Sequence, residues 1–338
     1  MSDSELTLGE CGEHHLIERL RPYCLVAAIG DDAAVLKPPA HQDLVFSTDV
    51  LVDGVHFSVG MACPVVTMAP YDVGWRAAAA NLSDLAAMAA MPLGLTVAVT
   101  APSTCPVAVI EGIYQGLAAC CHTYGTGILG GDTCRSSVLS LSLSILGSAP
   151  PERLIYRHGA QPGDVIVATG VHGAARAGLE CLLQPEWAAT LPPDLRQAWI
   201  KAHQHPRPRL DVVQWLWQQL PPPRVAGMDS SDGLADAVLQ ICAASGVGAR
   251  LWAEAIPKVP FLEPEQALAW ALYGGEDFEL VLCLPPAIAP ELCTIAGQGA
   301  AMIGEITATG NIFLEQGQTL RPLDPQQRFQ HFSPATSP

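Results

Sequence analysis

Residues 138–145 read VLSLSLSI, so that leucine and serine alternate along the segment. A period of two places the leucines on one face of an extended strand and the serines on the other. The segment therefore predicts a half-buried strand with one face against an apolar core. Helical and apolar patterns alternate on both sides of it, which is typical of an α/β or α+β fold.

The 338 residues are enough for two domains. Pro150 and Pro151 follow the alternating strand, and such a pair is a natural domain boundary. We therefore expect one domain over residues 1–149 and a second α/β domain over residues 150–338. In the first domain, a strand over residues 43–48 is expected to end at Asp49, and another over residues 127–129 is expected to end at a Gly-Gly-Asp turn.

Six short acidic clusters run through the chain, although only 15% of its residues are charged. We expect them to be loops at strand ends that converge on one site. Two carboxylates about 5 Å apart would repel by roughly 3 kcal/mol at an effective dielectric constant near 20, so such a site needs cations. Oxygen ligands favour Mg²⁺ completed by water and phosphate. The clusters are Gly30-Asp31-Asp32, Ser47-Thr48-Asp49, Asn81-Leu82-Ser83-Asp84, Gly130-Gly131-Asp132, Asp229-Ser230-Ser231-Asp232-Gly233 and Gly274-Gly275-Glu276-Asp277.

Each cluster also has a simpler interpretation. A Gly-Asp pair is common in ordinary turns. Asp84 lies in a predicted helix over residues 73–90 that is otherwise apolar, where an unpaired carboxylate is costly, although it could also be solvated. Ser231 or Asp232 could be the N-cap of the following helix. A cap and a phosphate ligand are compatible roles, because a helix N-terminus offers free N–H groups.

Two further residues stand near these clusters. His56 follows the Asp49 cluster closely enough for a substrate role, although a lone histidine is often structural. Arg157 is one of few cations beside the domain boundary, and its guanidinium could clamp a phosphate or lie on the surface.

The composition limits the class of partner. The net charge is -16, with 17 Lys and Arg against 33 Asp and Glu, which argues against nucleic acid and against an anionic membrane surface. No P-loop motif is present, so a bound polyphosphate must be neutralised by metal and arginine. The eleven cysteines form no C-x-x-C pair, and the N-terminus lacks signal-peptide features. We expect a cytoplasmic protein with free thiols and no membrane span.

In order and spacing, the acidic clusters resemble those of the thiamine-monophosphate kinase family, part of the superfamily of aminoimidazole ribonucleotide synthetase and selenophosphate synthetase. The resemblance runs from about Gly12 to the His331-Phe332 tail. The sequence departs from the family where a serine follows Asp229, a position at which an apolar residue is frequent. The resemblance implies two α/β domains, with the N-terminal sheet pairing with its copy in a homodimer barrel. It also implies ATP and Mg²⁺ binding in the N-terminal domain.

The implied reaction is transfer of the γ-phosphoryl group of ATP to thiamine monophosphate, which gives thiamine diphosphate. Gly131, Asp132, Arg157, Ser231 and, more weakly, Tyr124 would contact ATP. His56, Glu276 and Phe329 would hold the thiamine substrate. The implied ligands of several Mg²⁺ ions are Asp32, Ser47, Thr48, Asp49, Asp84, Asp132, Asp229 and Asp232.

No covalent nucleophile is needed for this reaction, since phosphoryl transfer depends mainly on positioning and charge neutralisation. We expect a direct in-line transfer without a phosphoenzyme. Two alternatives stay open at this level: another ATP-dependent enzyme of the same superfamily, and a non-catalytic module that binds Mg²⁺ or nucleotide.

Overall fold

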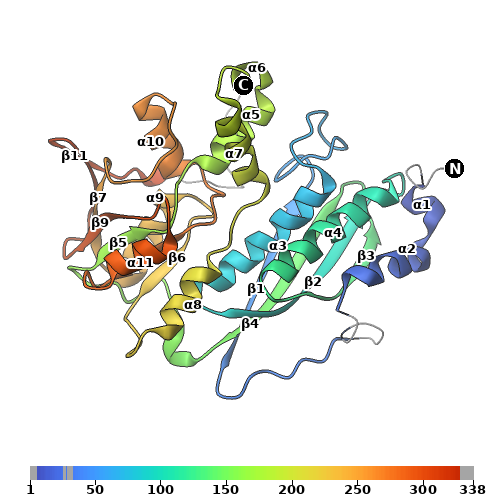
Figure 1. The fold of residues 1–338 in the computed structure, drawn as a ribbon, viewed down its shortest axis with the longest axis horizontal. Coiled ribbons are helices and arrows are strands. Elements are labelled where there is room, and N and C mark those ends of the chain that lie inside the picture. The colour runs from blue at the N-terminus through green and yellow to red at the C-terminus, as the bar shows by residue number, and fades with distance from the viewer. Residues whose placement is uncertain (1–5, 26–27, 29–32, 328–338) are drawn as a thin grey trace. The chain divides into compact units, whose positions relative to one another are not determined.

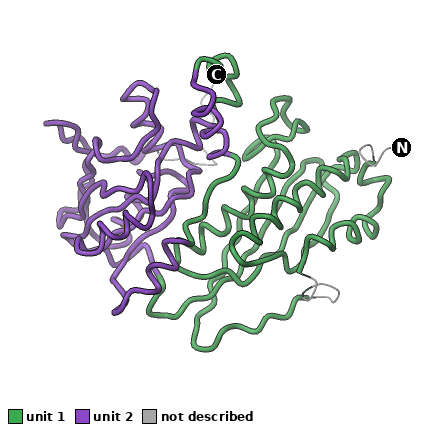
Figure 2. The backbone as a smooth tube through the Cα atoms, viewed as in Figure 1, with its two compact units in different colours: residues 1–154, 179–190, 204–210 green, residues 155–178, 191–203, 211–338 purple. Residues whose placement is uncertain are grey.

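The computed structural model describes residues 6–25, 28 and 33–327 (Figure 1). Within these ranges the chain is a mixed α/β structure with one four-stranded and one seven-stranded sheet. It forms two compact units (Figure 2). Unit 1 comprises residues 1–154, 179–190 and 204–210, and unit 2 comprises residues 155–178, 191–203 and 211–338. The expected domain boundary between residues 149 and 150 stays a prediction.

The sheet of unit 1 has the strand order β1-β4-β2-β3. β4 lies antiparallel to both β1 and β2, whereas β3 runs parallel to β2. The predicted alternating strand is β4: Leu141, Leu143 and Ile145 are buried, whereas Ser142 and Ser144 are half-buried. The predicted half-buried strand is therefore confirmed. The strands are β1 (Asp43–Val52), β2 (Met91–Ala101), β3 (Ile128–Arg135) and β4 (Ser140–Ala149).

Two long helices, α3 (Pro70–Ala87) and α4 (Val107–Thr123), lie side by side over the sheet of unit 1 (Figure 1). Glycines let their backbones touch: a Cβ on Gly74 would stand 1.9 Å from the Ile113 carbonyl, and one on Gly116 1.9 Å from the Tyr71 carbonyl. The helices cover the face of β4 that carries the buried leucines, which leaves the serine face outside this helix pair. The shorter helices here are α1 (Leu8–Cys11), α2 (Glu13–Leu20), η1 (Arg21–Tyr23), η2 (Pro151–Arg153) and α6 (Pro185–Ala188).

A segment from much later in the chain completes unit 1 at the start of α3. His205 Nε2 lies 2.6 Å from Asp72 Oδ1, and its ring stacks on Trp75 with centroids 5.0 Å apart. The Trp75 indole N–H donates to the Pro206 carbonyl at 3.4 Å. Residues 204–210 are therefore fixed to α3 by ring stacking and by hydrogen bonds to Asp72 and Trp75.

The sheet of unit 2 has the order β11-β10-β7-β9-β5-β8-β6 and is mixed, because β10 runs parallel to β7. Helix α9 packs on β6, β7 and β8 and buries Val238 and Ile241 in the same core as Leu251 and Val281. The strands are β5 (Val165–Ala168), β6 (Ala226–Asp229), β7 (Gly248–Trp252), β8 (Leu280–Leu284), β9 (Ala301–Thr307), β10 (Ile312–Gln316) and β11 (Thr319–Pro322). The remaining helices are α5 (Ala174–Leu183), α7 (Pro193–Gln204), α8 (Leu210–Gln218), α9 (Leu234–Ser245), α10 (Pro264–Tyr273), α11 (Ala289–Ala296) and η3 (Pro325–Gln327).

In the part of the chain that the structure describes, no helix has both the length and the apolar character that a membrane crossing requires.

Two acidic clusters differ from the expected loops. Each residue of β1, from Asp43 to Val52, pairs with β4, so Asp49 lies inside the strand. Asp132 likewise lies inside β3, where it pairs with Ala98 of β2. The prediction that both strands end at the acidic cluster is wrong, because each backbone ladder continues past the carboxylate. The alternation of a strand, rather than a loop, therefore sets the direction of these side chains.

Candidate functional site

β1 and α3 bring two of the acidic clusters together. Ser47 and Asp49 lie on the same face of β1, and the Ser47 hydroxyl donates to Asp84 Oδ2 at 2.5 Å. Asp84 is half-buried, although its neighbours Ser83 and Leu85 on α3 are fully buried. A hydrogen bond from Ser47 offsets part of the cost of holding a carboxylate in this apolar helix.

Thr48 turns the other way. Its hydroxyl donates to the Leu143 carbonyl at 2.7 Å and accepts a 3.3 Å hydrogen bond from Ser144. The side chain of Thr48 therefore lies on the face of the sheet opposite Ser47, as strand alternation requires.

The donors on β1 and α3 have the chemistry that Mg²⁺ prefers. Ser47, Asp49 and Asp84 offer hydroxyl and carboxylate oxygens, and Mg²⁺ is commonly held by one or two carboxylates with water and phosphate in the other positions. Across the described ranges, no three His, Cys, Asp or Glu side chains stand close enough together to hold a metal ion. Asp32, another predicted ligand from the N-terminal half, lies outside the described residues. This donor set fits Mg²⁺ shared with a phosphate ligand.

A cavity of about 860 Å³ opens on the serine face of the unit 1 sheet, within the size range of small-molecule sites. Gly131 and Asp132 of β3 lie in its wall, as do Ser142 and Ser144 of β4. Apolar side chains make up much of the rest, among them Ile17, Leu20, Phe46, Leu129 and Leu146. An apolar wall beside a glycine-aspartate strand suits a planar ring with a polar extension.

A tyrosine that the sequence analysis did not single out, Tyr114, lies beside this cavity. Tyr114 lies inside α4, is buried, and is part of the cavity wall. Burial raises the pKa of its phenol, so the hydroxyl stays protonated. A Cβ on Gly131 would stand 3.3 Å from that hydroxyl. Tyr124 is instead the C-cap of α4 and is not part of the cavity wall.

Asp49 and Asp132 do not meet within one sheet. Across the strands, Asp49 is in register with Leu143 and Val97, whereas Asp132 pairs with Ala98, one residue further along β2. Their side chains therefore lie on opposite faces. They also lie on opposite edges of the sheet, about 14 Å apart at the usual strand spacing.

His56 lies in the turn after β1 and is half-buried. Its Nδ1 accepts the Val52 backbone N–H at 3.2 Å, and its own backbone N–H donates to the Val52 carbonyl at 3.0 Å. An accepting Nδ1 places the ring proton of neutral histidine on Nε2. In neutral His56, the ring N–H is therefore on the nitrogen that does not accept from Val52.

The acidic loop of unit 2 follows β6. Asp229 is the last residue of that strand and is buried, and the Ser231 hydroxyl donates to its Oδ1 at 2.9 Å. Asp232 is exposed. The N-cap of α9 is Gly233, with φ of 105°, and it makes no side-chain capping bond. The interpretation of Ser231 or Asp232 as the N-cap is therefore wrong.

Ser230, the residue at which the sequence departs from the family pattern, has a partner that the sequence did not reveal. His172 is buried, its Nδ1 lies 3.0 Å from the Gly170 carbonyl, and its Nε2 lies 3.1 Å from the Ser230 hydroxyl. Since the carbonyl can only accept, Nδ1 donates to it, and in the neutral form of His172 Nε2 then accepts from Ser230. The hydroxyl in place of an apolar side chain thus completes a buried hydrogen-bonded chain.

Glu276 and Asp277 have different roles beside this loop. The Glu276 backbone N–H donates to the Ser231 carbonyl at 2.7 Å, and Glu276 has φ of 60°, a left-handed conformation often found at functional sites. Asp277 accepts the backbone N–H groups of Gly173 at 2.7 Å and Ala175 at 2.8 Å, so it holds the start of α5. Burial raises the pKa of Asp277 to about 6, against the opposing effect of nearby His172.

Arg157 is exposed and is anchored to α9. Its Nη1 donates to Gln240 Oε1 at 2.6 Å, and its backbone carbonyl accepts the Ser245 hydroxyl at 3.2 Å. The structure therefore gathers Arg157, the Asp229 loop and Glu276 in unit 2, and Ser47, Asp49 and Asp84 in unit 1. Phe329 lies outside the described residues.

Comparison with known proteins follows this division of the chain. Residues 30–149 match the model of the AIR synthase related protein N-terminal domain, and residues 161–316 match that of the AIR synthase related protein C-terminal domain. The fold is thus that of a two-domain AIR synthase related protein.

Individual relatives narrow the class. The chain is 48% identical to the thiamine-monophosphate kinase of Synechococcus elongatus, over 98% of this chain and 99% of the relative. It resembles the crystal structure of thiamine-monophosphate kinase from Stenotrophomonas maltophilia K279a, with a TM-score of 0.77 and 31% identity over 89% of this chain and 95% of that one. It also resembles AaThiL complexed with AMPPCP and TMP, with a TM-score of 0.72 and 28% identity over 97% and 99% of the two chains.

The chain belongs to the thiamine-monophosphate kinase family. The resemblance inferred from the acidic clusters is confirmed.

Proposed function

We propose that this chain phosphorylates thiamine monophosphate with ATP and so forms thiamine diphosphate. The observation that carries this proposal is the 48% identity to a thiamine-monophosphate kinase over 98% of the chain. The complex of AaThiL with AMPPCP and TMP supports ATP as the phosphoryl donor and thiamine monophosphate as the acceptor.

Several Mg²⁺ ions are part of this proposal. When bound, they neutralise phosphate oxygens that would otherwise repel each other and the acidic protein. The chemistry of the donors and the Ser47–Asp84 hydrogen bond support it. The proposed ligands remain Asp32, Ser47, Thr48, Asp49, Asp84, Asp132, Asp229 and Asp232. Thr48 would bind the metal through its backbone, because its hydroxyl donates to the Leu143 carbonyl.

The protein itself positions the two substrates. Gly131 and the buried Tyr114 form a wall suited to the nucleotide. Tyr124 remains a proposed contact of ATP. Arg157 and Ser231 would bind phosphate oxygens as donors. His56 would donate its Nε2–H to the thiamine substrate. For this substrate, Glu276 and Phe329 remain proposed contacts.

The transfer is proposed to be direct and in line. The carboxylates of the site are proposed to bind metal rather than to attack phosphorus, and no step requires a protein nucleophile. Rapid quenching during turnover with ATP labelled at the γ-phosphate tests this step. We expect label in thiamine diphosphate alone, and a labelled protein band that forms and decays at the turnover rate would refute it.

A homodimer is the proposed functional form. Asp49 and Asp132 lie on opposite faces and edges of one sheet, so a shared site for both is difficult to build from a single copy. The serine face also exposes Leu44, Phe46 and Val50 on β1, an apolar row suited to a second copy. A cytoplasmic location stays a prediction.

The decisive experiment measures ADP formation with Mg²⁺ and ATP, with and without thiamine monophosphate, and identifies the product by chromatography. We expect ADP and thiamine diphosphate in equal amounts, and no ADP without the acceptor. ADP formed with another acceptor only would indicate a different enzyme of the superfamily. Binding of ATP without any turnover would indicate a non-catalytic module.

A further inference from the structure

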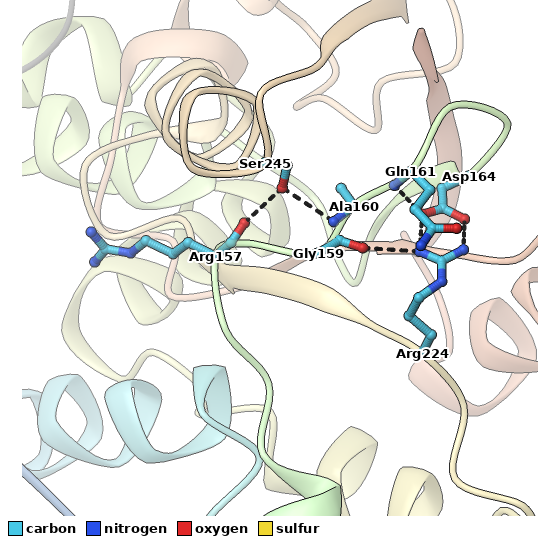
Figure 3. Close-up of polar contacts among 7 residues, drawn as sticks. All are labelled: Arg157, Gly159, Ala160, Gln161, Asp164, Arg224 and Ser245. Atoms are coloured by element: carbon cyan, nitrogen blue, oxygen red, sulfur yellow. Dashed lines mark hydrogen bonds and ion pairs between the residues drawn. The ribbon is translucent and has the colours of Figure 1, made fainter. Parts of the chain in front are cut away.

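Arg157 is held by its side chain as well as by its backbone. The Arg157 carbonyl accepts the Ser245 hydroxyl at 3.2 Å, and the same hydroxyl accepts the Ala160 N–H at 3.1 Å (Figure 3). The guanidinium extends away from these contacts (Figure 3). Its Nη1 donates to Gln240 Oε1 at 2.6 Å. Ser245 and Gln240 both belong to α9, so one helix fixes both ends of Arg157.

The contact with Gln240 continues to a buried carboxylate. Gln240 Nε2 donates to Asp236 Oδ2, one helical turn earlier on α9. Asp236 is only 6% exposed. A carboxylate can only accept and a guanidinium can only donate, so the Gln240 amide has a single orientation that satisfies both neighbours. The three side chains form a relay with a defined direction, from Arg157 through Gln240 to Asp236.

The backbone around Arg157 does not need this relay. The Arg224 guanidinium binds both oxygens of Asp164, at 2.5 and 2.6 Å, and donates to the Gly159 carbonyl at 3.1 Å (Figure 3). Together with Ser245, these contacts fix the segment from residue 157 to residue 164. The relay therefore acts on the direction of the Arg157 side chain rather than on the path of the chain.

Helix α9 also connects Arg157 to the acidic loop. It begins at Leu234, directly after the cluster that ends in Asp232 and Gly233, and Asp236 lies in its first turn. A helix is a stiff element of defined length, with a rise of about 1.5 Å per residue. The position of the guanidinium is thereby tied to the position of the loop proposed to bind metal.

We propose that Gln240 and Asp236 are positioning residues that hold the Arg157 guanidinium ready for the phosphates of ATP. The inference rests on the proposed function, in which Arg157 contacts ATP. The relay uses one N–H of the guanidinium and leaves others in the planar fork to bind phosphate. Because the side chain is ordered before ATP arrives, less conformational freedom is lost on binding.

The test measures ATP affinity by calorimetry on the full chain with Mg²⁺, together with steady-state kinetics. Arg157→Ala sets the reference and should weaken ATP binding about 50-fold or more. Gln240→Met, which keeps the length but not the hydrogen bonds, should weaken it about 5- to 10-fold and raise KM for ATP more than it lowers kcat. Gln266→Met is the matched control, since Gln266 is an exposed glutamine on helix α10 of the same unit. It should change neither quantity.

A double-mutant cycle separates positioning from general stabilisation. If Gln240 acts through Arg157, then Gln240→Met should have no further effect on ATP affinity in the Arg157→Ala background. The same should hold for Asp236→Asn, which allows the Gln240 amide to turn. Additive effects, or no effect of Gln240→Met in the native background, would overturn the inference but leave the proposed reaction intact. An Arg157→Ala variant with native ATP affinity would overturn both the role of Arg157 and the relay.

Discussion

Phe46 tests the proposed dimer most directly. Its ring stands on the serine face of β1 with 69% of its surface exposed, and β1 is an edge strand of the unit 1 sheet. The large aromatic side chain has roughly 200 Å² of surface to bury, so about 140 Å² per copy is available to a partner. A second copy of the chain would bury two such rings.

The size of the effect follows from this area. At about 25 cal/mol per Å², complete burial of both rings would contribute at most about 7 kcal/mol. Burial at interfaces is incomplete and alanine keeps Cβ, so we expect Phe46→Ala to weaken association by about 3 kcal/mol. This corresponds to a rise of about 150-fold in the dimer Kd.

Sedimentation equilibrium over a concentration series measures that Kd directly. Phe261→Ala is the matched control, because Phe261 is the same residue type with 70% exposure and belongs to unit 2. We expect the Phe46 variant alone to shift toward monomer, with an unchanged melting temperature at concentrations where both proteins are monomeric. An unchanged Kd, or an equal shift in both variants, would refute the assignment of this face to the dimer.

Four further predictions concern the site and the stability of the fold. Asp84→Asn should reduce kcat/KM at least about 100-fold, and high Mg²⁺ should restore part of the activity. The circular dichroism spectrum should be unchanged. Near-native activity would show that Asp84 is not a metal ligand. Gly116→Ala should lower the free energy of unfolding, measured by urea denaturation, by about 2–4 kcal/mol. The new Cβ would overlap a carbonyl oxygen of α3, and the cost of this overlap outweighs the gain of about 1 kcal/mol in helix propensity. Burial raises the pKa of Cys121 to about 12. Iodoacetamide at pH 8 should therefore leave Cys121 unmodified in the native protein, whereas the exposed Cys134 should react. Equal modification rates of the two thiols, measured by mass spectrometry, would contradict the burial of Cys121. The raised pKa of Asp277 means that the folded state holds the carboxyl proton more tightly than the unfolded chain does. The protonated carboxyl therefore contributes to stability below about pH 4, and this contribution is lost as the pH rises through about 6. The stability advantage of the native protein over Asp277→Asn should shrink by about 1–2 kcal/mol between pH 4 and pH 7, and a constant difference would argue against the raised pKa.

Elements with a strong period could be predicted from the sequence. The apolar helical pattern over residues 73–90 predicted helix α3, which begins and ends three residues earlier in the structure. β4 was equally clear from its alternating leucines and serines. The sequence did not predict β7, because Gly248 and Arg250 interrupt its short apolar pattern. Backbone pairing with β9 and β10 defines it as a strand.

Cross-strand register explains what the sequence could not provide for the candidate site. A local pattern places Asp49 and Asp132 next to strands, but only the ladders reveal that the strands continue and that the two side chains face opposite ways. Tyr114 had no signal of its own, because a tyrosine inside an apolar helix is usually part of the core. The Gln240 relay was equally invisible, since its partners lie 4 and 83 residues away.

The stacking of His205 on Trp75 bears on how the chain matures during synthesis. A ribosome releases α3 and its sheet long before residues 204–210, yet those residues supply a hydrogen-bond partner of Asp72 and the ring that stacks on the indole. Until they emerge, Asp72 keeps only its local hydrogen bond from the Ala69 N–H, and the Trp75 indole lacks the ring that stacks on it. A fragment cut at residue 149 would lack these contacts permanently, because the stretch around His205 that belongs to the same compact unit would be missing.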